Sequence, residues 1–233
     1  MSATRLPGKP LLKINGLSII SHVSKKAEEA NIGDVIVATE DQEIVDDVKR
    51  NGFNAILTSN QHKTGTDRIY EALKKSNIKD VDLVMNLQGD EPAIEIDDIK
   101  NLNNKMLKNV SNLGTLAAKI KDNEKLKNED IVKVVTEKSL EEGYFSKAVS
   151  FSRKSEQIDN IYHHIGIYCY ARDCLEKFVK MDQSKNEIEN RLEQLRALDN
   201  NIDIYVSLAS SSPIGVDTKE DYLALKKIME YKN

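Results

Sequence analysis

Charged residues surround a glycine at the start of this chain, in the stretch RLPGKP at 5–10. Glycine lets backbone N–H groups approach a ligand closely, and Arg5 and Lys9 supply positive charge on either side of Gly8. These residue types at this spacing are typical of a loop that wraps an anion such as a phosphate. The alternative is an ordinary disordered start of the chain, and the stretch by itself leaves both interpretations open.

Carboxylates gather at the end of a predicted strand in QGDEP, residues 88–92. A turn there presents Gln88, Asp90 and Glu91 at the carboxyl end of the strand, where open α/β sheets bind their ligands. Two neighbouring acidic groups repel each other unless a cation is present, and hard oxygen ligands suit Mg²⁺. The alternative is a solvated turn that ends in proline.

A further carboxylate, Asp217, precedes a predicted helix near the C-terminus, in SSPIGVDTKEDYLAL. One interpretation is helix N-capping, which contributes about 1 kcal/mol. The other is that Asp217 joins Asp90 on one metal ion.

The stretch HKTGTDRIYEAL at 62–73 opens another predicted helix. Thr64 and Asp67 have the spacing of a capping box, and Arg68 lies in the first turn. A loop that leads into a helix N-terminus is also a common anion site. Capping and substrate binding are compatible here, so the pattern allows both.

Two adjacent histidines, His163 and His164, lie in a predicted strand and therefore point to opposite faces. They cannot easily share one metal ion, and no third ligand has a suitable spacing, which argues against zinc. Tyr168 follows four residues later, on the same face as His164. A packed or exposed histidine is the alternative to a role in a cleft.

A helix is predicted over 186–201, NEIENRLEQLRALDNN. Its apolar stripe is expected to be buried and to leave Glu193 and Gln194 on a different face, as an ordinary charged surface. The stripe consists of Ile188, Leu192, Leu195 and Leu198.

Composition excludes several classes of protein. The 233 residues include 39% hydrophobic ones, enough for a proper core, and the net charge of −4 comes from mixed charges without a basic stripe, which argues against nucleic-acid binding. The apolar runs are too short to span a membrane and no signal segment opens the chain, so we expect a cytoplasmic protein. Cys169 and Cys174 fit no metal or redox motif and are expected to be reduced, partly buried thiols.

Hydrophobic periodicity predicts a doubly wound α/β fold with a mostly parallel, mixed sheet, because strands and helices alternate along the first half. The second half is less regular. Predicted strands cover 34–39, 54–59, 81–87, 113–120, 131–136, 163–171 and 202–209. Predicted helices cover 18–31, 41–52, 66–77, 171–181, 186–201 and 218–232.

One expected element is missing. A doubly wound domain normally begins with a buried strand that leads into its phosphate loop, and here the loop stands at the start of the chain. The first strand usually lies in the middle of the sheet, so its loss leaves neighbouring backbone groups unpaired. Either the polypeptide begins upstream and Met1 is an internal methionine, or the protein is impaired.

Taken together, these motifs resemble the cytidylyltransferases that activate 3-deoxy-manno-octulosonate (Kdo), known as CMP-Kdo synthetases. The resemblance runs in order from residue 3 to about residue 225. It rests on RLPGKPL, VATED, HKTGTDRI, NLQGDEP, FSR, HHIGIYCY, LEQLRAL and GVDTKEDY. It implies a Rossmann-like nucleotidyltransferase fold and the transfer of CMP from CTP to the anomeric hydroxyl of Kdo.

The resemblance also implies roles for individual residues. Lys9, Asp90 and Asp217 would be catalytic, with the two aspartates holding Mg²⁺ at the α-phosphate. The implied CTP contacts are Arg5, Leu6, Gly8, Lys9 and Thr66. The implied sugar contacts are Arg68, Gln88, Arg153, His164, Tyr168, Glu193 and Gln194. An arginine among them can bind the Kdo carboxylate through two hydrogen bonds.

The expected organisation is one nucleotidyltransferase domain over 1–233. Within it, about 1–110 bind the nucleotide, about 111–210 serve sugar binding and dimerisation, and about 202–233 form a closing strand and helix. The resemblance implies a homodimer. The chain departs from the family pattern at Asp67, where relatives usually have Glu, and in a shortened loop after Arg153.

Two other functions stay open at this point. One is a cytidylyltransferase that acts on 8-amino-Kdo or a sialic acid. The other is a nucleotide-binding protein without turnover, because of the missing strand.

Overall fold

The computed structural model describes residues 6–120, 123–154, 159–212 and 215–231, and the chain divides into two compact units. Unit 1 comprises 1–79, 87–99 and 213–233, and unit 2 comprises 80–86 and 100–212. The elements of unit 1 are η1 (Lys9–Leu11), β1 (Lys13–Ile14), β2 (Leu17–Ser18), α1 (Ile19–Ala30), β3 (Val37–Thr39), α2 (Gln42–Arg50), β4 (Ala55–Leu57), α3 (Gly65–Lys75) and α9 (Lys219–Tyr231).

Unit 2 contains most of the strands. Its elements are β5 (Leu83–Asn86), β6 (Leu113–Lys119), α5 (Asn123–Lys127), β7 (Lys133–Thr136), η2 (Leu140–Glu142), β8 (Ser146–Ser152), β9 (Ile161–Ala171), α6 (Arg172–Phe178), α7 (Lys185–Asn190), α8 (Leu195–Asp199) and β10 (Tyr205–Leu208). The helix α4 (Ile96–Asn109), for which no element is predicted, begins in unit 1 and continues in unit 2. No helix in the described residues is long and apolar enough to cross a membrane.

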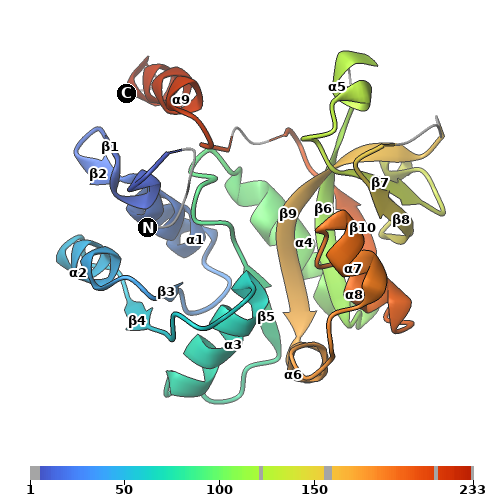
Figure 1. Ribbon diagram of the computed structural model, residues 1–233, viewed down its shortest axis with the longest axis horizontal. Helices are drawn as coiled ribbons and strands as arrows, with labels where there is room; N and C mark the ends of the chain where they lie inside the picture. Colours follow the sequence, from blue (N-terminus) through green and yellow to red (C-terminus); the bar gives the residue numbers. More distant parts are fainter. Residues whose placement is uncertain (1–5, 121–122, 155–158, 213–214, 232–233) are drawn as a thin grey trace. The chain divides into compact units, whose positions relative to one another are not determined.

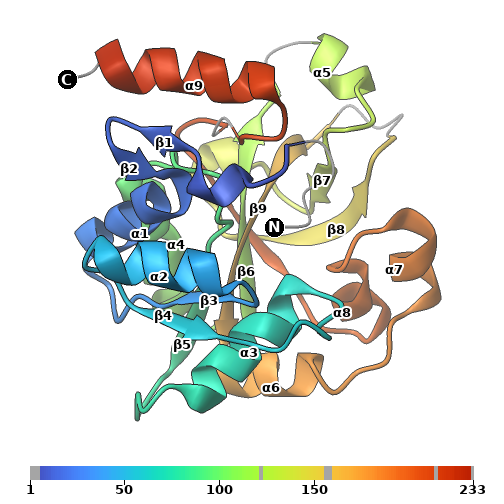
Figure 2. The same ribbon diagram turned by 60° about the vertical axis from the view of Figure 1, so that its left-hand side comes forward.

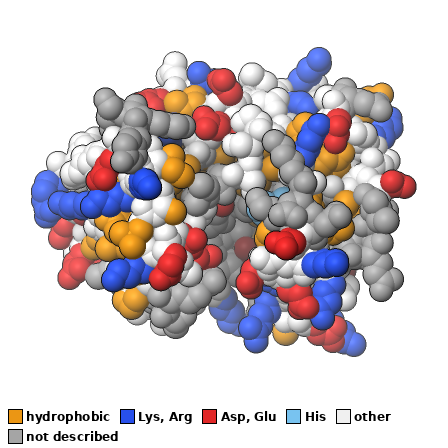
Figure 3. Space-filling view, turned by 90° about the horizontal axis from the view of Figure 1, so that it is seen from above, with side chains coloured by type: hydrophobic (Ala, Val, Ile, Leu, Met, Phe, Trp, Pro, Cys, Tyr) orange, Lys and Arg blue, Asp and Glu red, His pale blue; other side chains and the backbone are white. Residues whose placement is uncertain are grey.

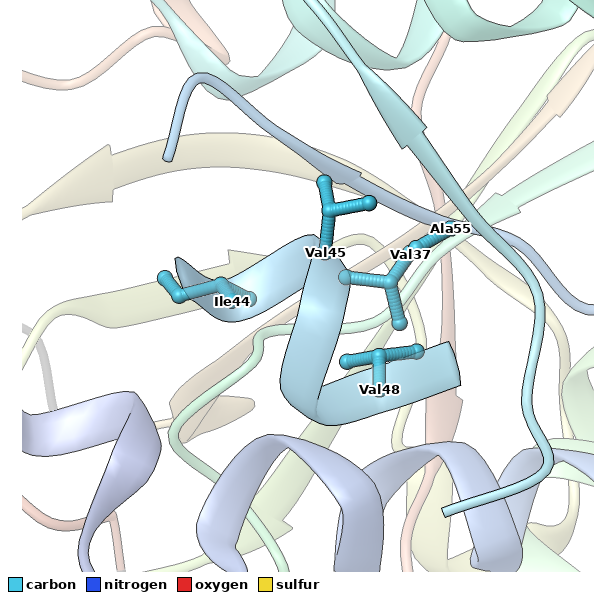
Figure 4. Close-up of a cluster of buried hydrophobic side chains, with 5 residues drawn as sticks. All are labelled: Val37, Ile44, Val45, Val48 and Ala55. Carbon is cyan, nitrogen blue, oxygen red and sulfur yellow. The ribbon is translucent and has the colours of Figure 1, made fainter. Parts of the chain in front are cut away.

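In unit 1, β3 and β4 form a parallel pair that α2 covers (Figure 1). The helix begins where the Asp41 side chain accepts a hydrogen bond from the backbone of Glu43. Its apolar positions recur at helical spacing and meet the two strands in a small core (Figure 4). That core consists of Val37, Ile44, Val45, Val48 and Ala55.

A short hairpin, β1–β2, was not predicted. Asn15 and Gly16 connect its strands with φ angles of 49° and 81°, the two positive values that a two-residue type I′ turn requires. The hairpin lies beside α9 (Figure 2), and the Tyr222 hydroxyl donates a hydrogen bond of 2.7 Å to the Lys13 carbonyl. The Asn-Gly pair is a strong signal for such a hairpin, although its strands are only two residues long.

A second apolar cluster joins segments that are far apart in the sequence. Ile14 and Ile19 from the N-terminal region pack with Val216 and Leu225, and all of them are fully buried. Leu6 packs against the same cluster. It therefore holds the N-terminal turn, the start of α1 and the C-terminal helix α9 together.

Unit 2 is built around a six-stranded sheet in the order β5-β9-β6-β10-β8-β7, with β7 also pairing with β9 (Figure 1). The 11-residue β9 runs antiparallel to β5, β6 and β7, and only β10 and β6 are parallel in this sheet. The sheets are mixed, as predicted, but with fewer parallel pairs than the prediction of a mostly parallel sheet. The difference arises because β9 returns as one long antiparallel strand.

The strands do not join into one sheet. Among the described residues no strand precedes β1, and β3 and β4 form a two-stranded sheet of their own. Within the described pairings, β3 pairs only with β4 and β5 only with β9.

Lys, Arg, Asp and Glu side chains are interspersed on the face drawn in Figure 3, as the mixed charge pattern predicts.

The single helix predicted over 186–201 is wrong. The chain forms α7 and α8, and Arg191 between them adopts a left-handed conformation with φ 53°. Ile188, expected in the buried stripe, is 59% exposed, whereas Leu192 and Leu195 are buried. The break turns the two halves of the sequence pattern in different directions, so a stripe drawn on one continuous helix does not apply.

Replacing Leu225 by alanine tests the cluster that holds the three segments of unit 1. We expect Leu225→Ala to lower the free energy of unfolding by about 2–5 kcal/mol, because it leaves a cavity in a packed core. The matched control is Leu223→Ala on the same helix, where the side chain is 52% exposed and the expected change is within about 0.5 kcal/mol. Urea unfolding measures both. Equal losses in the two variants would contradict the assigned core.

Candidate active site

The stretch RLPGKP forms a turn that presents Lys9. The Lys9 N–H donates to the Leu6 carbonyl at 3.2 Å, and Gly8 has φ 71° and ψ 10°, which is the third position of a type II turn. A side chain at this position would be strained, which explains the glycine. The turn leads directly into η1, with Lys9 as its first residue. Arg5 lies outside the described residues.

The turn after β5 positions Asp90. It is closed by the Glu91 N–H, which donates to the Gln88 carbonyl at 3.3 Å. The Asp90 carbonyl accepts a hydrogen bond of 3.0 Å from the Val216 N–H. Because Val216 is fully buried in the apolar cluster, this bond fixes the backbone before Asp217 beside the backbone of Asp90.

Asp217 does not cap α9. Thr218 and Asp221 form the cap: the Asp221 N–H donates to the Thr218 hydroxyl at 3.1 Å, and the Asp221 carboxylate accepts from the Thr218 N–H at 2.8 Å. The N-cap interpretation of Asp217 is therefore wrong. Its side chain, 51% exposed, points to a different partner.

That partner is Lys9, which bridges the two aspartates. The Lys9 Nζ atom lies 2.6 Å from Asp90 Oδ2 and 3.2 Å from Asp217 Oδ1. The Lys9 side chain is 11% exposed. Carboxylates separated by 127 positions in the sequence, 90 and 217, thus converge on one positive charge. The arrangement can bind a cation between two oxygen ligands.

Glu91 adds a third carboxyl group to this neighbourhood. Burial, together with the charges of Asp90 and Asp217, raises the pKa of Glu91 to about 7. Its Oε2 atom is buried without a hydrogen-bond partner among the described residues. No group of three or more His, Cys, Asp or Glu side chains in the described part of the chain is arranged to hold a metal ion by itself. A metal here would have two protein carboxylates and would take further ligands from a substrate or water.

The HKTGTDR segment in unit 1 leads into α3, and its last four residues, Gly65 to Arg68, form the start of that helix. Thr64 caps α3 by accepting from the Asp67 N–H at 3.2 Å, as predicted. Arg68 is held by the Glu40 carboxylate at 2.6 Å and donates to the Thr58 hydroxyl at 2.8 Å. Glu40 belongs to the VATED motif, so two of the quoted motifs meet in this ion pair.

Burial and hydrogen bonds also hold the start of α3 in place. The predicted CTP contact Thr66 is only 2% exposed. Within α3, Glu71 accepts hydrogen bonds from Lys75, from the Ser59 N–H and from His62. These bonds lower the pKa of Glu71 to about 2. The Glu71 contacts therefore tie α3, which carries Thr66 and Arg68, to the preceding residues Ser59 and His62.

In unit 2, His164 and Tyr168 lie on one face of β9, as predicted. Their ring centroids are 5.5 Å apart, and Phe151 contacts His164 edge-on at 5.0 Å. The register shift in β9 opposite Thr115 and Leu116 brings the two rings side by side. Burial, with a smaller effect from His163, lowers the pKa of His164 to about 3. His164 is therefore a neutral hydrogen-bonding group, 3.1 Å from the Thr115 hydroxyl.

Arg153 follows β8, and a lysine that the sequence analysis missed fixes its backbone. Lys133 is fully buried, and its Nζ atom donates to the Arg153 carbonyl at 2.7 Å and to the Asn128 carbonyl at 2.5 Å. The Arg153 guanidinium donates to the Glu129 carbonyl at 3.2 Å. A lysine inside an apolar strand pattern was the available signal, but its partners are backbone carbonyls outside that strand, at Asn128 and Arg153.

Glu193 and Gln194 lie in the turn between α7 and α8, and a buried ion pair fixes this turn. Arg196 makes two hydrogen bonds to the Glu187 carboxylate, at 2.5 and 2.8 Å, and both residues are at most 3% exposed. Burial raises the pKa of Tyr168, and the charges of Tyr170 and then of Glu193 raise it further. Gln194 is buried rather than on a charged surface, which corrects the default interpretation of this segment.

The structure thus sorts the predicted residues into two sets. Unit 1 carries Leu6, Gly8, Lys9, Thr66, Arg68, Gln88, Asp90 and Asp217. Unit 2 carries Arg153, His164, Tyr168, Glu193 and Gln194. In the first set, Lys9, Asp90 and Asp217 come into direct contact, and in the second, His164 and Tyr168 do so. Their roles toward substrate remain predictions.

The low pKa of His164 gives a stability that depends on pH. An unfolded histidine titrates near 6.5, so below this pH the unfolded chain takes up a proton that the folded chain refuses until about pH 3. This proton uptake by the unfolded chain should lower the free energy of unfolding by about 2 kcal/mol between pH 7 and pH 5, whereas above pH 6.5 it has little effect. His164→Gln keeps a polar group that does not titrate. Its free energy of unfolding should therefore fall by about 2 kcal/mol less than that of the wild type over the same interval. Urea unfolding at both pH values measures it, and equal pH dependence in both proteins contradicts the assignment.

Sequence comparison supplies the family. Residues 1–204 match the cytidylyltransferase family. Curated relatives named 3-deoxy-manno-octulosonate cytidylyltransferase include one from Nitrobacter winogradskyi, 39% identical over 98% of this chain and 91% of the relative, and one from Agrobacterium fabrum, 38% identical over 98% and 92%.

Solved structures agree. A CMP:2-keto-3-deoxy-manno-octonic acid synthetase in complex with CTP is 33% identical, covers 100% of this chain and 95% of its own, and superposes with a TM-score of 0.89. An apo UDP-glucose pyrophosphorylase, 15% identical over 100% of this chain and 96% of its own, shares the fold with a TM-score of 0.72. These similarities confirm the predicted α/β nucleotidyltransferase fold. The chain belongs to the cytidylyltransferase family and, within it, to the 3-deoxy-manno-octulosonate cytidylyltransferases.

Proposed function

We propose that this chain transfers CMP from CTP to the anomeric hydroxyl of Kdo, giving CMP-Kdo and pyrophosphate for lipopolysaccharide biosynthesis. The observation that carries the proposal is the convergence of Asp90 and Asp217 on one cation, next to the glycine turn that presents Lys9. This is the arrangement that a reaction between two anions requires, because their mutual repulsion is the main obstacle. The names of the relatives supply the identity of the two substrates.

Asp90 and Asp217 are the residues that would hold Mg²⁺. The donor set fits, since both supply carboxylate oxygens to one positive charge and leave the other coordination positions to phosphate oxygens and water. When bound, a divalent cation neutralises phosphate charge and lowers the pKa of a coordinated hydroxyl. No dedicated protein base is then needed for the sugar hydroxyl.

The chain's own cations bind and orient the triphosphate. Lys9, at the start of η1, and Arg5 neutralise it, while the Gly8 turn lets backbone approach the phosphates. The hydroxyl attacks the α-phosphorus in line, its bond to phosphorus forms as the bond to pyrophosphate breaks, and negative charge moves onto the pyrophosphate. Positive side chains near that leaving group stabilise the transition state. Leu6 and Thr66 complete the nucleotide contacts.

On the sugar side, Arg153 is the better candidate for binding the Kdo carboxylate. The Arg68 guanidinium already pairs with the Glu40 carboxylate, whereas the Arg153 guanidinium donates to a backbone carbonyl. Among the described residues no carboxylate pairs with Arg153, and a guanidinium of this kind retains more attraction for a substrate anion. The remaining proposed sugar contacts are Arg68, Gln88, His164, Tyr168, Glu193 and Gln194.

The assembly and location of the enzyme complete the proposal. It works in the cytoplasm as a homodimer, and the resemblance to CMP-Kdo synthetases supports both statements. Its partners are the small molecules CTP and Kdo, without nucleic acid or membrane.

Removing the charge of either aspartate tests the metal site. Asp90→Asn and Asp217→Asn should each reduce turnover on the order of a hundredfold, because each loses a ligand of the cation while keeping its shape. The matched control is Asp203→Asn, whose carboxylate pairs with Lys147 at 2.6 Å and should leave turnover unchanged. Pyrophosphate release at saturating Mg²⁺ measures all three. Near-normal turnover in either aspartate variant rejects that residue as a metal ligand.

Substrate choice is tested with a panel of acidic sugars. Pyrophosphate release from CTP should be fastest with Kdo and at least on the order of tenfold slower with 8-amino-Kdo or a sialic acid, since a misplaced polar group leaves a buried partner unsatisfied. Faster release with 8-amino-Kdo would reassign the substrate. CTP binding without release for any sugar would instead support a nucleotide-binding protein without turnover.

A further inference from the structure

The ammonium group of Lys9 lies where the proposed cation must lie. Its Nζ atom contacts one oxygen of each aspartate, at 2.6 Å from Asp90 and 3.2 Å from Asp217, and the side chain is nearly buried. Both oxygens therefore already have a positive partner in the protein. A divalent cation bound between them needs the same space and the same lone pairs.

We propose that Lys9 is an internal counter-cation: it holds the two carboxylates together in the metal-free protein and leaves them when a divalent cation binds. The inference rests on the metal site of the proposed function and adds a regulation of that site by the chain's own residue. Two cations that contact the same pair of carboxylate oxygens repel each other at short range, so the binding of one opposes the binding of the other.

The balance of charge favours the exchange. Against the two carboxylates of Asp90 and Asp217, Lys9 supplies one positive charge and a divalent cation supplies two. Lys9 can leave without backbone movement. Its ammonium is carried by a flexible four-carbon chain, while its backbone is fixed by hydrogen bonds to Leu6 and Leu12 in the turn and η1.

The exchange delivers a positive charge to the proposed phosphate loop. Once released, the ammonium remains attached beside Gly8, where the triphosphate of CTP is proposed to bind. Metal binding and the readiness of Lys9 for the triphosphate are then linked. Before metal arrives, the same lysine prevents the two carboxylates from repelling each other.

Competition for the site is measured with Mn²⁺ and no nucleotide, by following free Mn²⁺ in the electron paramagnetic resonance spectrum. Lys9→Met removes the competing charge at similar length, so we expect Mn²⁺ to bind this variant on the order of tenfold more tightly than the wild type, about 1.4 kcal/mol. The matched control, Lys147→Met, removes a lysine that pairs with Asp203 at 2.6 Å and should leave Mn²⁺ affinity unchanged.

Release of the ammonium is measured separately, because removing any nearby positive charge would strengthen Mn²⁺ binding somewhat. In the wild type, the Cε–Nζ correlation of Lys9, identified by its absence from Lys9→Met, should move toward that of exposed lysines as Mg²⁺ is added. The Lys147 signal should stay in place. This readout does not depend on turnover.

The outcomes separate the inference from the proposed function. An unmoved Lys9 signal at Mg²⁺ saturation, or equal Mn²⁺ affinity in wild type and Lys9→Met, overturns the inference alone if Asp217→Asn still loses turnover. Failure of both proteins to bind Mn²⁺ overturns the inference and the metal site together. Tighter binding with a moved signal supports both.

Discussion

Two carboxylates of like charge must stay close together in this protein, and the rest of unit 1 is organised around that constraint. The Lys9 ammonium offsets their repulsion at 2.6 and 3.2 Å, but an ion pair alone does not fix positions. Rigidity comes from the Val216–Asp90 backbone hydrogen bond and from the apolar cluster around Val216 and Leu225. Burial of apolar side chains therefore positions the charges, and the charges determine what can bind.

Three further cationic side chains also have partners within the protein. Arg68 is paired with Glu40, Arg196 with Glu187, and Lys133 with two backbone carbonyls. In each case the positive group has a fixed partner within the protein before any substrate arrives. A charged side chain that already has a partner in the protein loses less conformational freedom when a ligand binds. It also keeps the neighbouring loops in place. The segments that carry Arg153, Glu193 and Gln194 are held in this indirect way.

Most helices and strands could be predicted because their periodicity follows from local sequence, as in α2, where apolar residues at helical spacing face the β3–β4 pair. The errors occur where tertiary contacts override the local pattern. Leucines continue across 186–201, but the left-handed Arg191 and the buried Glu187–Arg196 pair break the helix there. Lys133 was missed because its carbonyl partners come from other segments, which no periodicity encodes.

Asp217 illustrates how the structure decides between two local interpretations. An aspartate before a helix is a natural N-cap, whereas the resemblance to CMP-Kdo synthetases implies a metal ligand at the same position. Thr218 and Asp221 form the cap between them, so the cap does not require the Asp217 side chain. Its carboxylate is then available to Lys9, which is 208 positions away in the sequence. The Thr218–Asp221 cap supplies acceptors for the backbone N–H groups of Thr218 and Asp221 at the start of α9. The Asp217 carboxylate can therefore interact with a cation.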